Sequence, residues 1–388
     1  MLKAIFAAAL LAASAVQAAG DYRVLYRFQG DADGGEPGGS LIRDAAGNLY
    51  GVAIAGGEGR AGIVFKLSPQ GVKTTLHAFG RHDGVSPVTP LLLDEQGALF
   101  GLTETGGSYC NDIGCGIAYE IAPDGSARTL HAFKPAQGSF PVGGLVANAS
   151  GNLFGTLYQD GPTRTGTLFR LSPQGSFKLL HAFDGDTEGS RPHGLIAGRK
   201  GNLYGVTSQG GPANSGTAFR YAPDGTVTVL HGFLSGESPA GQLARDGSGN
   251  LYGVLALSGP GRNGSIYRLA RDGTFTTLYA FTGGADGSQP ISTPVLDRQG
   301  NIYGTMRFGP GDRTAGAECE DSCGAVYELA ADGTLSVIHA FANDAGGYYP
   351  MDDLLLDRRR LIGATFSGGV PGGQCADGCG VIYAVGVK

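Results

Sequence analysis

Eight side chains outside the repeated parts of the sequence could form a binding or catalytic site. They are His193, Arg307, Phe308, Tyr109, Tyr348, Tyr349, Asp352 and Asp353. A carboxylate pair with a histidine is compatible with general acid–base chemistry, and exposed aromatic rings can form a platform for a sugar. Spacing along the chain establishes neither arrangement. We therefore predict a ligand site that uses these residues and assign none of them as catalytic.

The six cysteines occur as three closely spaced couples in corresponding loops. The couples are Cys110 with Cys115, Cys319 with Cys323, and Cys375 with Cys379. In an exported chain, couples of this spacing favour local disulfides over free thiols. A thiolate metal site shared by the last two couples is the alternative, but no histidine stands beside them to complete a zinc-ligand set. We therefore predict three disulfides and no metal site.

Two acidic loops resemble half of a calcium-binding loop. Residues 31–34 read Asp-Ala-Asp-Gly and residues 184–186 read Asp-Gly-Asp. A complete calcium loop needs a third ligand and a distal glutamate in register, and neither follows here. We predict turns at both places and no cofactor, with calcium as the alternative.

Five histidines occupy the same position in five different repeats. They are His77, His131, His181, His231 and His339. Residues at one repeated position lie in separate structural units, so they cannot converge on one metal ion or substrate. We predict that they pack or form hydrogen bonds at the rim of the molecule.

Four short signatures recur in a fixed order and explain these repeated positions. Leu-His-Ala-Phe at residues 76–79 (strand D) returns in identical or looser form at residues 25, 130, 180, 230, 278 and 338. An apolar segment as at 91–94 (strand A), a Gly-Asn-Leu-Tyr-Gly block as at 47–51 (strand B) and a Gly-x-x-aromatic block as at 62–65 (strand C) keep the same phase. Four short strands about every 50 residues are typical of a β-propeller. The sequence predicts an all-β, seven-bladed β-propeller with four antiparallel strands per blade.

The order of the segments also predicts how the ring closes. The chain begins with a D segment and ends with a C segment, which leaves one isolated strand and one incomplete blade. Both would be exposed sheet edges, which proteins avoid. Pairing residues 22–28 as the outermost strand of the last blade removes both edges, so we predict that the N-terminal strand closes the last blade.

The strand directions divide the connections between two faces. Short turns between strands A and B, such as 297–300, and between C and D, such as 222–225, form one face, which we name the turn face. The D–A and B–C connections, including 309–323 and 370–379, form the loop face. Function concentrates on variable loops held by a rigid scaffold. We predict an inert turn face, and a site on the loop face near the mouth of the central funnel.

The repeat resembles a known family. The blocks Gly-Asn-Leu-Tyr-Gly, Gly-Thr-Ala-Phe-Arg-Tyr-Ala-Pro-Asp-Gly and Leu-His-Gly-Phe are similar to the GloVer-type tandem repeat over residues 22–385. The resemblance implies an exported bacterial repeat protein with a propeller-like fold. The family has no established biochemical activity, so the resemblance carries over no catalytic residue.

Composition and the N-terminus agree with export. The chain has 70 glycines and 19 prolines in 388 residues, which nearly excludes long helices. Residues 1–18 combine a lysine, an apolar run and small residues, as a signal peptide does, and leave 19–388 as a single propeller domain. No second apolar stretch has the length of a membrane span. A nucleic-acid partner would need a basic face, but the formal charge is −6 and no Lys/Arg run is longer than residues 358–360, so we predict no such partner.

These observations define one functional prediction and two alternatives. We predict an exported, monomeric protein, periplasmic or secreted, that binds a glycan or a protein through its loop face. One alternative is an extracellular lyase or hydrolase with an active site in the funnel. The other is a structural protein of the envelope or matrix. The glycine-rich loops offer few fixed side chains, so binding is favoured over catalysis.

Overall fold

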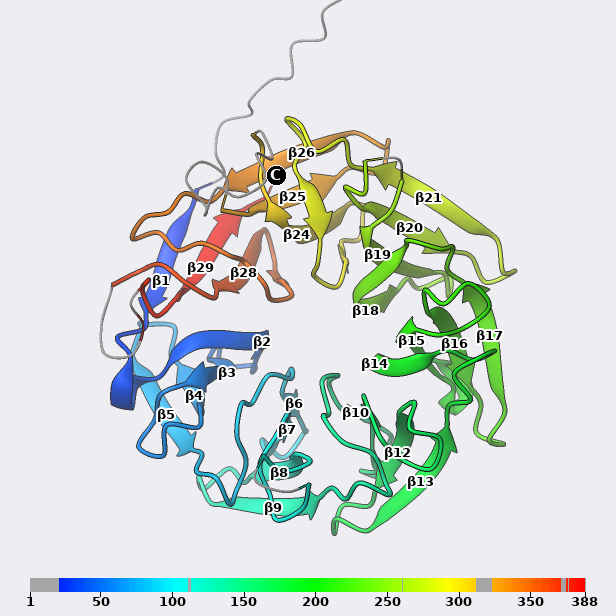
Figure 1. Ribbon diagram of the computed structural model, residues 1–388. Coiled ribbons are helices and arrows are strands. Elements are labelled where there is room, and N and C mark those ends of the chain that lie inside the picture. The colour runs from blue at the N-terminus through cyan, green and yellow to red at the C-terminus, as the bar shows by residue number, and fades with distance from the viewer. Residues whose placement is uncertain are drawn as a thin grey trace, which may run out of the picture.

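Seven antiparallel sheets surround a common axis in the computed structural model (Figure 1), which confirms the seven-bladed β-propeller. The structure describes residues 21–110, 113–259, 261–311, 323–370, 375 and 377–387. The predicted signal peptide and Cys319 lie outside the described residues. None of the helices within the described ranges is long and apolar enough to cross a membrane.

The first four blades follow one another along the chain. Blade 1 comprises β2 (Gly35–Arg43), β3 (Leu49–Ala55), β4 (Ile63–Leu67) and β5 (Lys73–Ala78). Blade 2 comprises β6 (Leu92–Leu93), β7 (Leu99–Thr103), β8 (Ile117–Ile121) and β9 (Ala127–Ala132). Blade 3 comprises β10 (Val146–Ala147), β11 (Leu153–Leu157), β12 (Thr167–Leu171) and β13 (Phe177–Ala182). Blade 4 comprises β14 (Ser190–Ala197), β15 (Leu203–Gln209), β16 (Thr217–Tyr221) and β17 (Val227–Gly232).

The last three blades complete the ring. Blade 5 comprises β18 (Ser238–Arg245), β19 (Leu251–Leu257), β20 (Ser265–Leu269) and β21 (Phe275–Ala280). Blade 6 comprises β22 (Ser288–Pro290), β23 (Val295–Leu296), β24 (Ile302–Phe308), β25 (Ala325–Leu329) and β26 (Leu335–Ala340). Blade 7 comprises β27 (Leu355–Asp357), β28 (Arg360–Thr365), β29 (Val381–Gly386) and β1 (Arg23–Arg27). The described helices are the 3-10 turns η1 (Asp31–Asp33) and η2 (Arg199–Gly201).

The N-terminal strand closes the last blade, as predicted. Strand β1 pairs antiparallel with β29, with Arg23 opposite Ala384 and Arg27 opposite Val381. The order of the sheet is β1, β29, β28, β27. The first and last parts of the chain therefore share one sheet, and the ring has no unpaired strand at its closing seam.

The glycine that follows the B-strand aromatic makes room for the C-strand aromatic. In blade 2, Gly101 is the direct cross-strand partner of Tyr119. A Cβ atom on Gly101 would lie 2.3 Å from the Tyr119 hydroxyl oxygen, which is too close for any side chain. Gly155 stands in the same relation to Phe169 in blade 3. The two repeated signatures are therefore two halves of one packing unit.

The D-strand phenylalanine joins each blade to the next. Phe79 of blade 1 meets the ring of Tyr119 of blade 2 edge-on, with ring centroids 5.0 Å apart. Phe28 on the closing side packs in the same way against Phe65 of blade 1, at 5.3 Å. All four side chains are buried. These rings form the core between the blades, and that core holds the ring of sheets together.

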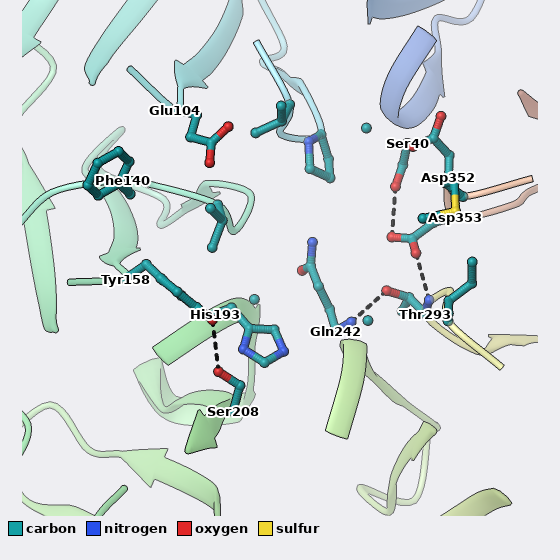
Figure 2. A pocket seen from close by; sticks show the side chains of 18 of the residues that line it. Ser40, Glu104, Phe140, Tyr158, His193, Ser208, Gln242, Thr293, Asp352 and Asp353 are labelled. Atoms are coloured by element: carbon teal, nitrogen blue, oxygen red, sulfur yellow. Dashed lines mark hydrogen bonds between the residues drawn. The ribbon is translucent and has the colours of Figure 1, made fainter. Parts of the chain in front are cut away.

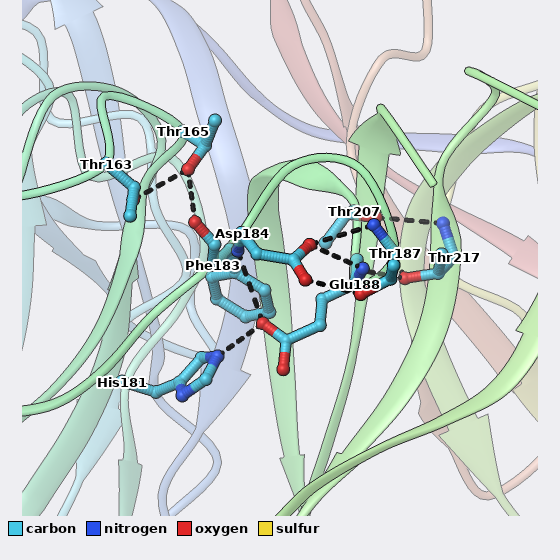
Figure 3. Close-up of polar contacts among 9 residues, drawn as sticks. All are labelled: Thr163, Thr165, His181, Phe183, Asp184, Thr187, Glu188, Thr207 and Thr217. Atoms are coloured by element: carbon cyan, nitrogen blue, oxygen red, sulfur yellow. Dashed lines mark hydrogen bonds and ion pairs between the residues drawn. The ribbon is translucent and has the colours of Figure 1, made fainter. Parts of the chain in front are cut away.

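Three of the five D-strand histidines, those of blades 1, 2 and 3, form rim hydrogen bonds. The other two stack on aromatic rings, His231 on Phe275 and His339 on Tyr22, so packing and hydrogen bonding both occur as predicted. His77 Nε2 lies 2.9 Å from Asp83 Oδ2, and His181 Nε2 lies 2.6 Å from Glu188 Oε2 (Figure 3). Tyr26 stands at the equivalent position of the closing strand and donates its hydroxyl to Asp33 at 2.7 Å. The two acidic loops are therefore occupied by local contacts, since Asp184 likewise accepts the backbone N–H of Glu188 at 2.9 Å.

A further repeated signature, Gly-x-x-Pro, lies just before the A strand or in its first residues in every blade and was not identified in the sequence. In blade 2 it covers residues 84–87, and Ser86 before the proline has a left-handed φ of 56°. Its N–H donates to the carbonyl oxygen of Ala61 in blade 1 at 3.0 Å. A Cβ atom on Gly62 would lie 2.4 Å from the ring of Pro87. The glycine that opens strand C is therefore required by the proline of the next blade.

Two of the predicted disulfides lie within the described residues. Cys110 is bonded to Cys115, and Cys375 to Cys379. Cys323 is also disulfide-bonded. The Cys375–Cys379 bridge packs at the closing seam, where a Cβ atom on Gly35 of blade 1 would lie 2.8 Å from Cys375 Sγ.

Candidate functional site

A cavity of about 650 Å³ lies at the loop face, where the inner strands of the blades converge. Its walls come from residues before or within strand A and from residues at or just after the end of strand B, so the ring itself positions them. Figure 2 shows Glu104, Gln242 and Asp353 on different sides of the same space. We name this cavity the funnel.

The funnel is lined where the repeat is least regular. The position two residues after the proline of the Gly-x-x-Pro signature reads Gly39, Thr89, Gly143, Gly194, Gly241, Ser292 and Asp352 in the seven blades, and the position before it reads Gly38, Val88, Val142, His193, Ala240, Ile291 and Met351. The first position is small except for the carboxyl of blade 7, and the second is small or apolar except for the histidine of blade 4. Near the end of strand B, Glu104, Tyr158 and Ser208 line the funnel, whereas blades 1 and 5 carry apolar residues at that position.

Asp353 connects four blades through hydrogen bonds. Its Oδ1 accepts the backbone N–H of Thr293 at 2.6 Å, and its Oδ2 accepts the hydroxyl of Ser40 at 2.7 Å. The hydroxyl oxygen of Thr293 in turn accepts the N–H of Gln242 at 2.8 Å. Because these residues belong to blades 5, 6, 7 and 1, the chain of bonds forms a rigid wall on one side of the funnel.

The carboxyl of Asp352 has a different hydrogen-bonding environment from that of Asp353. Its Oδ2 is buried and has no hydrogen-bond partner among the described residues. Burial raises the pKa of the Asp352 carboxyl well above its usual range, the negative charge of Asp353 raises it further, and a backbone hydrogen bond from Gly39 opposes both effects. This shift favours protonation of Asp352 compared with an exposed aspartate, and the protonated form can donate a hydrogen bond.

His193 is held as a neutral imidazole. Burial lowers its pKa, and backbone hydrogen bonds with Arg191 and Gly241 oppose the shift. Its Nδ1 faces the carbonyl oxygen of Arg191 at 3.5 Å. The Gln242 side chain lies beside it, across Gly194, where a Cβ atom would come within 2.5 Å of Gln242 Cγ. The glycine after His193 thus lets the amide reach the funnel.

The wall of the funnel opposite Asp353 carries aromatic rings and hydroxyl groups. The Ser208 hydroxyl donates to the Tyr158 hydroxyl oxygen at 3.3 Å, and the guanidinium of Arg191 lies 5.5 Å from the centre of the Tyr158 ring. Phe140 and Glu104 complete this side. Across the described residues, no group of three or more His, Cys, Asp and Glu side chains is placed to hold a metal ion.

Three of the eight predicted site residues come together, namely His193, Asp352 and Asp353. The predicted aromatic platform does not form, because Tyr348 is only 6% exposed and packs in the core between blades 6 and 7. Its hydroxyl donates to the carbonyl oxygen of Asp377 at 3.1 Å. Tyr349 is partly buried against Tyr348 and is not a wall of the funnel.

The remaining three candidates also lie outside the funnel walls. Arg307 is exposed, with its guanidinium 5.6 Å from the centre of the Phe308 ring. Tyr109 is exposed in blade 2, where the ammonium of Lys134 lies 4.8 Å from its ring centre. The sequence prediction took most of its candidates from blades 6 and 7. It did not include Glu104, Tyr158 and Gln242, which line the funnel.

Comparisons with known proteins agree with the repeat and the fold. The family model described as the Gloeobacter/Verrucomicrobia repeat matches residues 13–198 and 112–319. No curated protein matches the chain. The virginiamycin B lyase from Staphylococcus aureus aligns with 94% of this chain and 99% of that chain, with a TM-score of 0.62 and 12% identity.

Two lactonase-like structures are also similar. A protein provisionally named a 6-phosphogluconolactonase, from Bacteroides uniformis, aligns with 84% of this chain and 88% of that chain, with a TM-score of 0.51 and 18% identity. The gluconolactonase XC5397 from Xanthomonas campestris aligns with 95% and 89%, with a TM-score of 0.45 and 17% identity. At 12% and 18% identity, the likenesses to the lyase and to the Bacteroides uniformis protein extend to the propeller fold and assign no activity. The family model, by contrast, covers most of the chain, and the protein belongs to the Gloeobacter/Verrucomicrobia repeat family.

Proposed function

We propose that this protein is an exported binding protein that holds a small polar ligand, a unit of a glycan, in the funnel. The observation that carries the proposal is the convergence of repeat-breaking polar side chains on one cavity. Glu104, Tyr158, His193, Gln242 and Asp352 come from five different blades. The fold does not depend on such residues, since several other blades carry small or apolar residues at the equivalent positions, for example Ile54 and Ala256 at the end of strand B.

The size of the funnel favours a small molecule over a protein. About 650 Å³ lies within the range of roughly 300–1,000 Å³ that small-molecule sites occupy. The walls offer carboxyl groups, the amide of Gln242, the phenol of Tyr158 and the hydroxyl of Ser208. These groups match the many hydrogen-bond donors and acceptors of a sugar. The rings of Phe140 and Tyr158 add apolar faces. This combination suits a ligand rich in hydroxyl groups.

Asp352 supports a binding role on energetic grounds. An unpartnered buried polar group costs about 1–3 kcal/mol of stability. Residues that lower stability without a structural role are typical of functional sites. A ligand hydroxyl placed at Asp352 Oδ2 would supply the missing hydrogen-bond partner.

Disulfide bonding supports the exported part of the proposal. The Cys110–Cys115 and Cys375–Cys379 bridges are of the kind that persists in oxidising compartments. The compartment itself, periplasmic or extracellular, is part of the proposal.

A second candidate function, catalysis by a lyase or hydrolase, is favoured by one observation. Adjacent Asp352 and Asp353 have different environments: Asp352 has an unpartnered Oδ2 among the described residues and a raised pKa, and Asp353 accepts two hydrogen bonds. Two carboxyls whose pKa values are driven apart are a known basis for dividing acid and base roles. Neutral His193 lies in the same cavity and could accept a proton.

Glycan-array screening followed by calorimetry tests the binding proposal. The ligand found should bind one site, and Asp352→Asn and His193→Ala should each weaken binding about tenfold or more, the cost of losing a buried hydrogen bond. Tyr109→Ala is the control, because this exposed ring lies outside the funnel. Incubation of the same glycan with the protein separates the two functions, since product release that stops in Asp352→Asn supports catalysis.

A further inference from the structure

The turn face carries a second cavity, in the groove between blades 3 and 4. Its volume is about 410 Å³. Its walls come from the four strands and the A–B turn of blade 3, and from the A–B and C–D turns of blade 4 with the strand ends beside them. The groove lies away from the funnel, whose walls come from the loop face.

Two cations stand directly opposite each other at this groove. Arg170 on β12 is the cross-strand partner of Lys178 on β13, and both line the cavity. Neither has an ion-pair partner among the described residues. Like charges in directly opposite positions destabilise a sheet. The pair therefore lowers stability unless something negative lies beside it.

The other blades show that the repeat does not require two cations here. The equivalent pairs are Lys66 with Thr74, Glu120 with Arg128, Arg220 with Thr228, Arg268 with Thr276, Glu328 with Ser336, and Ala384 with Arg23. Blade 2 forms an ion pair at this position, and blade 4 a hydrogen bond from Arg220 to Thr228 at 3.1 Å. Blade 3 alone pairs two positive charges.

The same groove also lacks the carboxylates that the other A–B turns carry. Five turns begin with aspartate, at residues 44, 94, 246, 297 and 357. Blades 3 and 4 have Asn148 and Gly198 instead, and both residues line the cavity. The blade 4 turn continues with Arg199 and Lys200. Two negative charges are thus missing from the walls where Arg170 and Lys178 meet. Arg199 and Lys200 are not walls of the groove, and Arg199 donates to the carbonyl oxygen of Gly247 in blade 5.

The remaining walls suit an organic molecule. Phe154, Leu180 and Leu203 form an apolar floor, and Asn202 and Tyr221 add polar groups. Burial and Asp224 raise the pKa of Tyr221, and Arg170 lowers it, which places the phenol within reach of the arginine charge. Asp224 is not a wall of the groove and accepts the N–H of Thr226 at 2.9 Å.

We propose that this groove binds an oxyanion, the carboxylate or phosphate of a small organic molecule, between Arg170 and Lys178. Guanidinium and ammonium groups form strong charge-assisted bonds with both kinds of anion. The apolar floor would hold the body of the molecule. The site is independent of the funnel, and it gives a function to a face that the sequence predicts to be inert.

Calorimetric titrations at low ionic strength test the proposal with three probes: inorganic phosphate, D-glucuronate and neutral D-glucose. We expect one or both anions to bind a single site, and salt to weaken the binding. Phosphate binding alone identifies a phosphate site, and glucuronate binding alone a carboxylate site. If neither anion binds, or if glucose competes equally with the anion, the proposal is wrong.

Variants locate the site. Lys178→Thr reproduces the Arg268–Thr276 pair of blade 5, and Arg170→Gln removes the other charge. Each should raise the dissociation constant about tenfold or more, as expected for the loss of a charged hydrogen bond. The matched control Arg268→Gln, at the same repeat position, and the funnel variant Asp352→Asn should leave it unchanged.

Thermal unfolding without anion provides a check on folding. Lys178→Thr should unfold at a temperature no lower than the unchanged protein, because it removes a repulsion. Unchanged anion binding in both groove variants would overturn the proposal.

Discussion

Replacing Asp352 by asparagine removes a buried carboxyl and keeps its shape. The folded protein gives Asp352 Oδ2 no hydrogen-bond partner among the described residues, and burial together with Asp353 raises its pKa. Above the ordinary pKa of aspartate, the folded state therefore binds more protons than the unfolded state. Stability falls as pH rises from that ordinary value through the raised one. Asp352→Asn abolishes this loss.

The magnitude follows from the ionised form of the buried carboxyl, because asparagine leaves a neutral polar group in the same place. A buried charged group that lacks a hydrogen-bond partner costs about 1–3 kcal/mol or more, so we expect Asp352→Asn to increase the free energy of unfolding near neutral pH by this amount. The gain should disappear below the ordinary pKa of aspartate, where the carboxyl is protonated in both states. At the same time the variant should lose ligand affinity, because asparagine presents a different donor to the ligand.

Asp353→Asn is the matched control, and it should change the free energy of unfolding in the opposite direction. Its carboxylate accepts the Thr293 N–H and the Ser40 hydroxyl, and both bonds are charge-assisted. Charged hydrogen bonds contribute about 1.5–3 kcal/mol and neutral ones about 0.5–1.5. We therefore expect Asp353→Asn to lower the free energy of unfolding by about 1–3 kcal/mol.

Urea denaturation from pH 3 to pH 8 measures both variants, with intrinsic tyrosine fluorescence as the probe. Equal effects of the same sign in the two variants would refute the reasoning. So would a gain in Asp352→Asn that persists unchanged at the lowest pH, because that gain would then come from packing and not from charge.

Three further predictions concern the scaffold. Gly216→Ala should destabilise the protein far more than Gly225→Ala. Both glycines have φ near 90°, which costs alanine about 1–2 kcal/mol, but only on Gly216 would a Cβ atom clash, 1.9 Å from a backbone oxygen, whereas Gly225 has nothing within 4 Å. Denaturation midpoints measure the difference. Cys375→Ser should lower the free energy of unfolding by about 2 kcal/mol. A reducing agent should lower the stability of the unchanged protein and have a smaller effect on this variant. Deletion of β1 (Arg23–Arg27) should expose the edge of β29 and produce aggregation, measured by light scattering.

The fold could be predicted because its signatures are local and repeated in phase. Leu76–Phe79 and its copies define one strand position, and each glycine block defines another. The closing strand followed from an unpaired segment at each end of the chain. Hydrogen bonding of His77 and His181 at the rim followed from their separation into different blades.

The candidate site could be predicted only in part, because its contacts join distant blades. Asp353 contacts Ser40, which is 313 residues away, and Thr293, which is 60 residues away. No spacing rule connects such residues. Glu104 and Tyr158 could have been found by aligning the seven positions at the end of strand B and selecting those that depart from the repeat.

The error at Tyr348 has a physical cause in the turn beside it. Tyr349 precedes Pro350 and has a left-handed φ of 57°, as Ser86 does in blade 2. This conformation fixes which of the two tyrosines faces inward, and Tyr348 enters the core. Without the Gly-x-x-Pro signature, the two neighbours could not be distinguished.

Calorimetric titration of the glycan selected by array screening tests the central claim most directly. The unchanged protein should bind one equivalent, Asp352→Asn should bind about tenfold or more weakly despite its greater stability, and Tyr109→Ala should bind as the unchanged protein does. Full affinity in Asp352→Asn and His193→Ala, or a loss confined to Tyr109→Ala, would contradict the assignment of the funnel as the binding site.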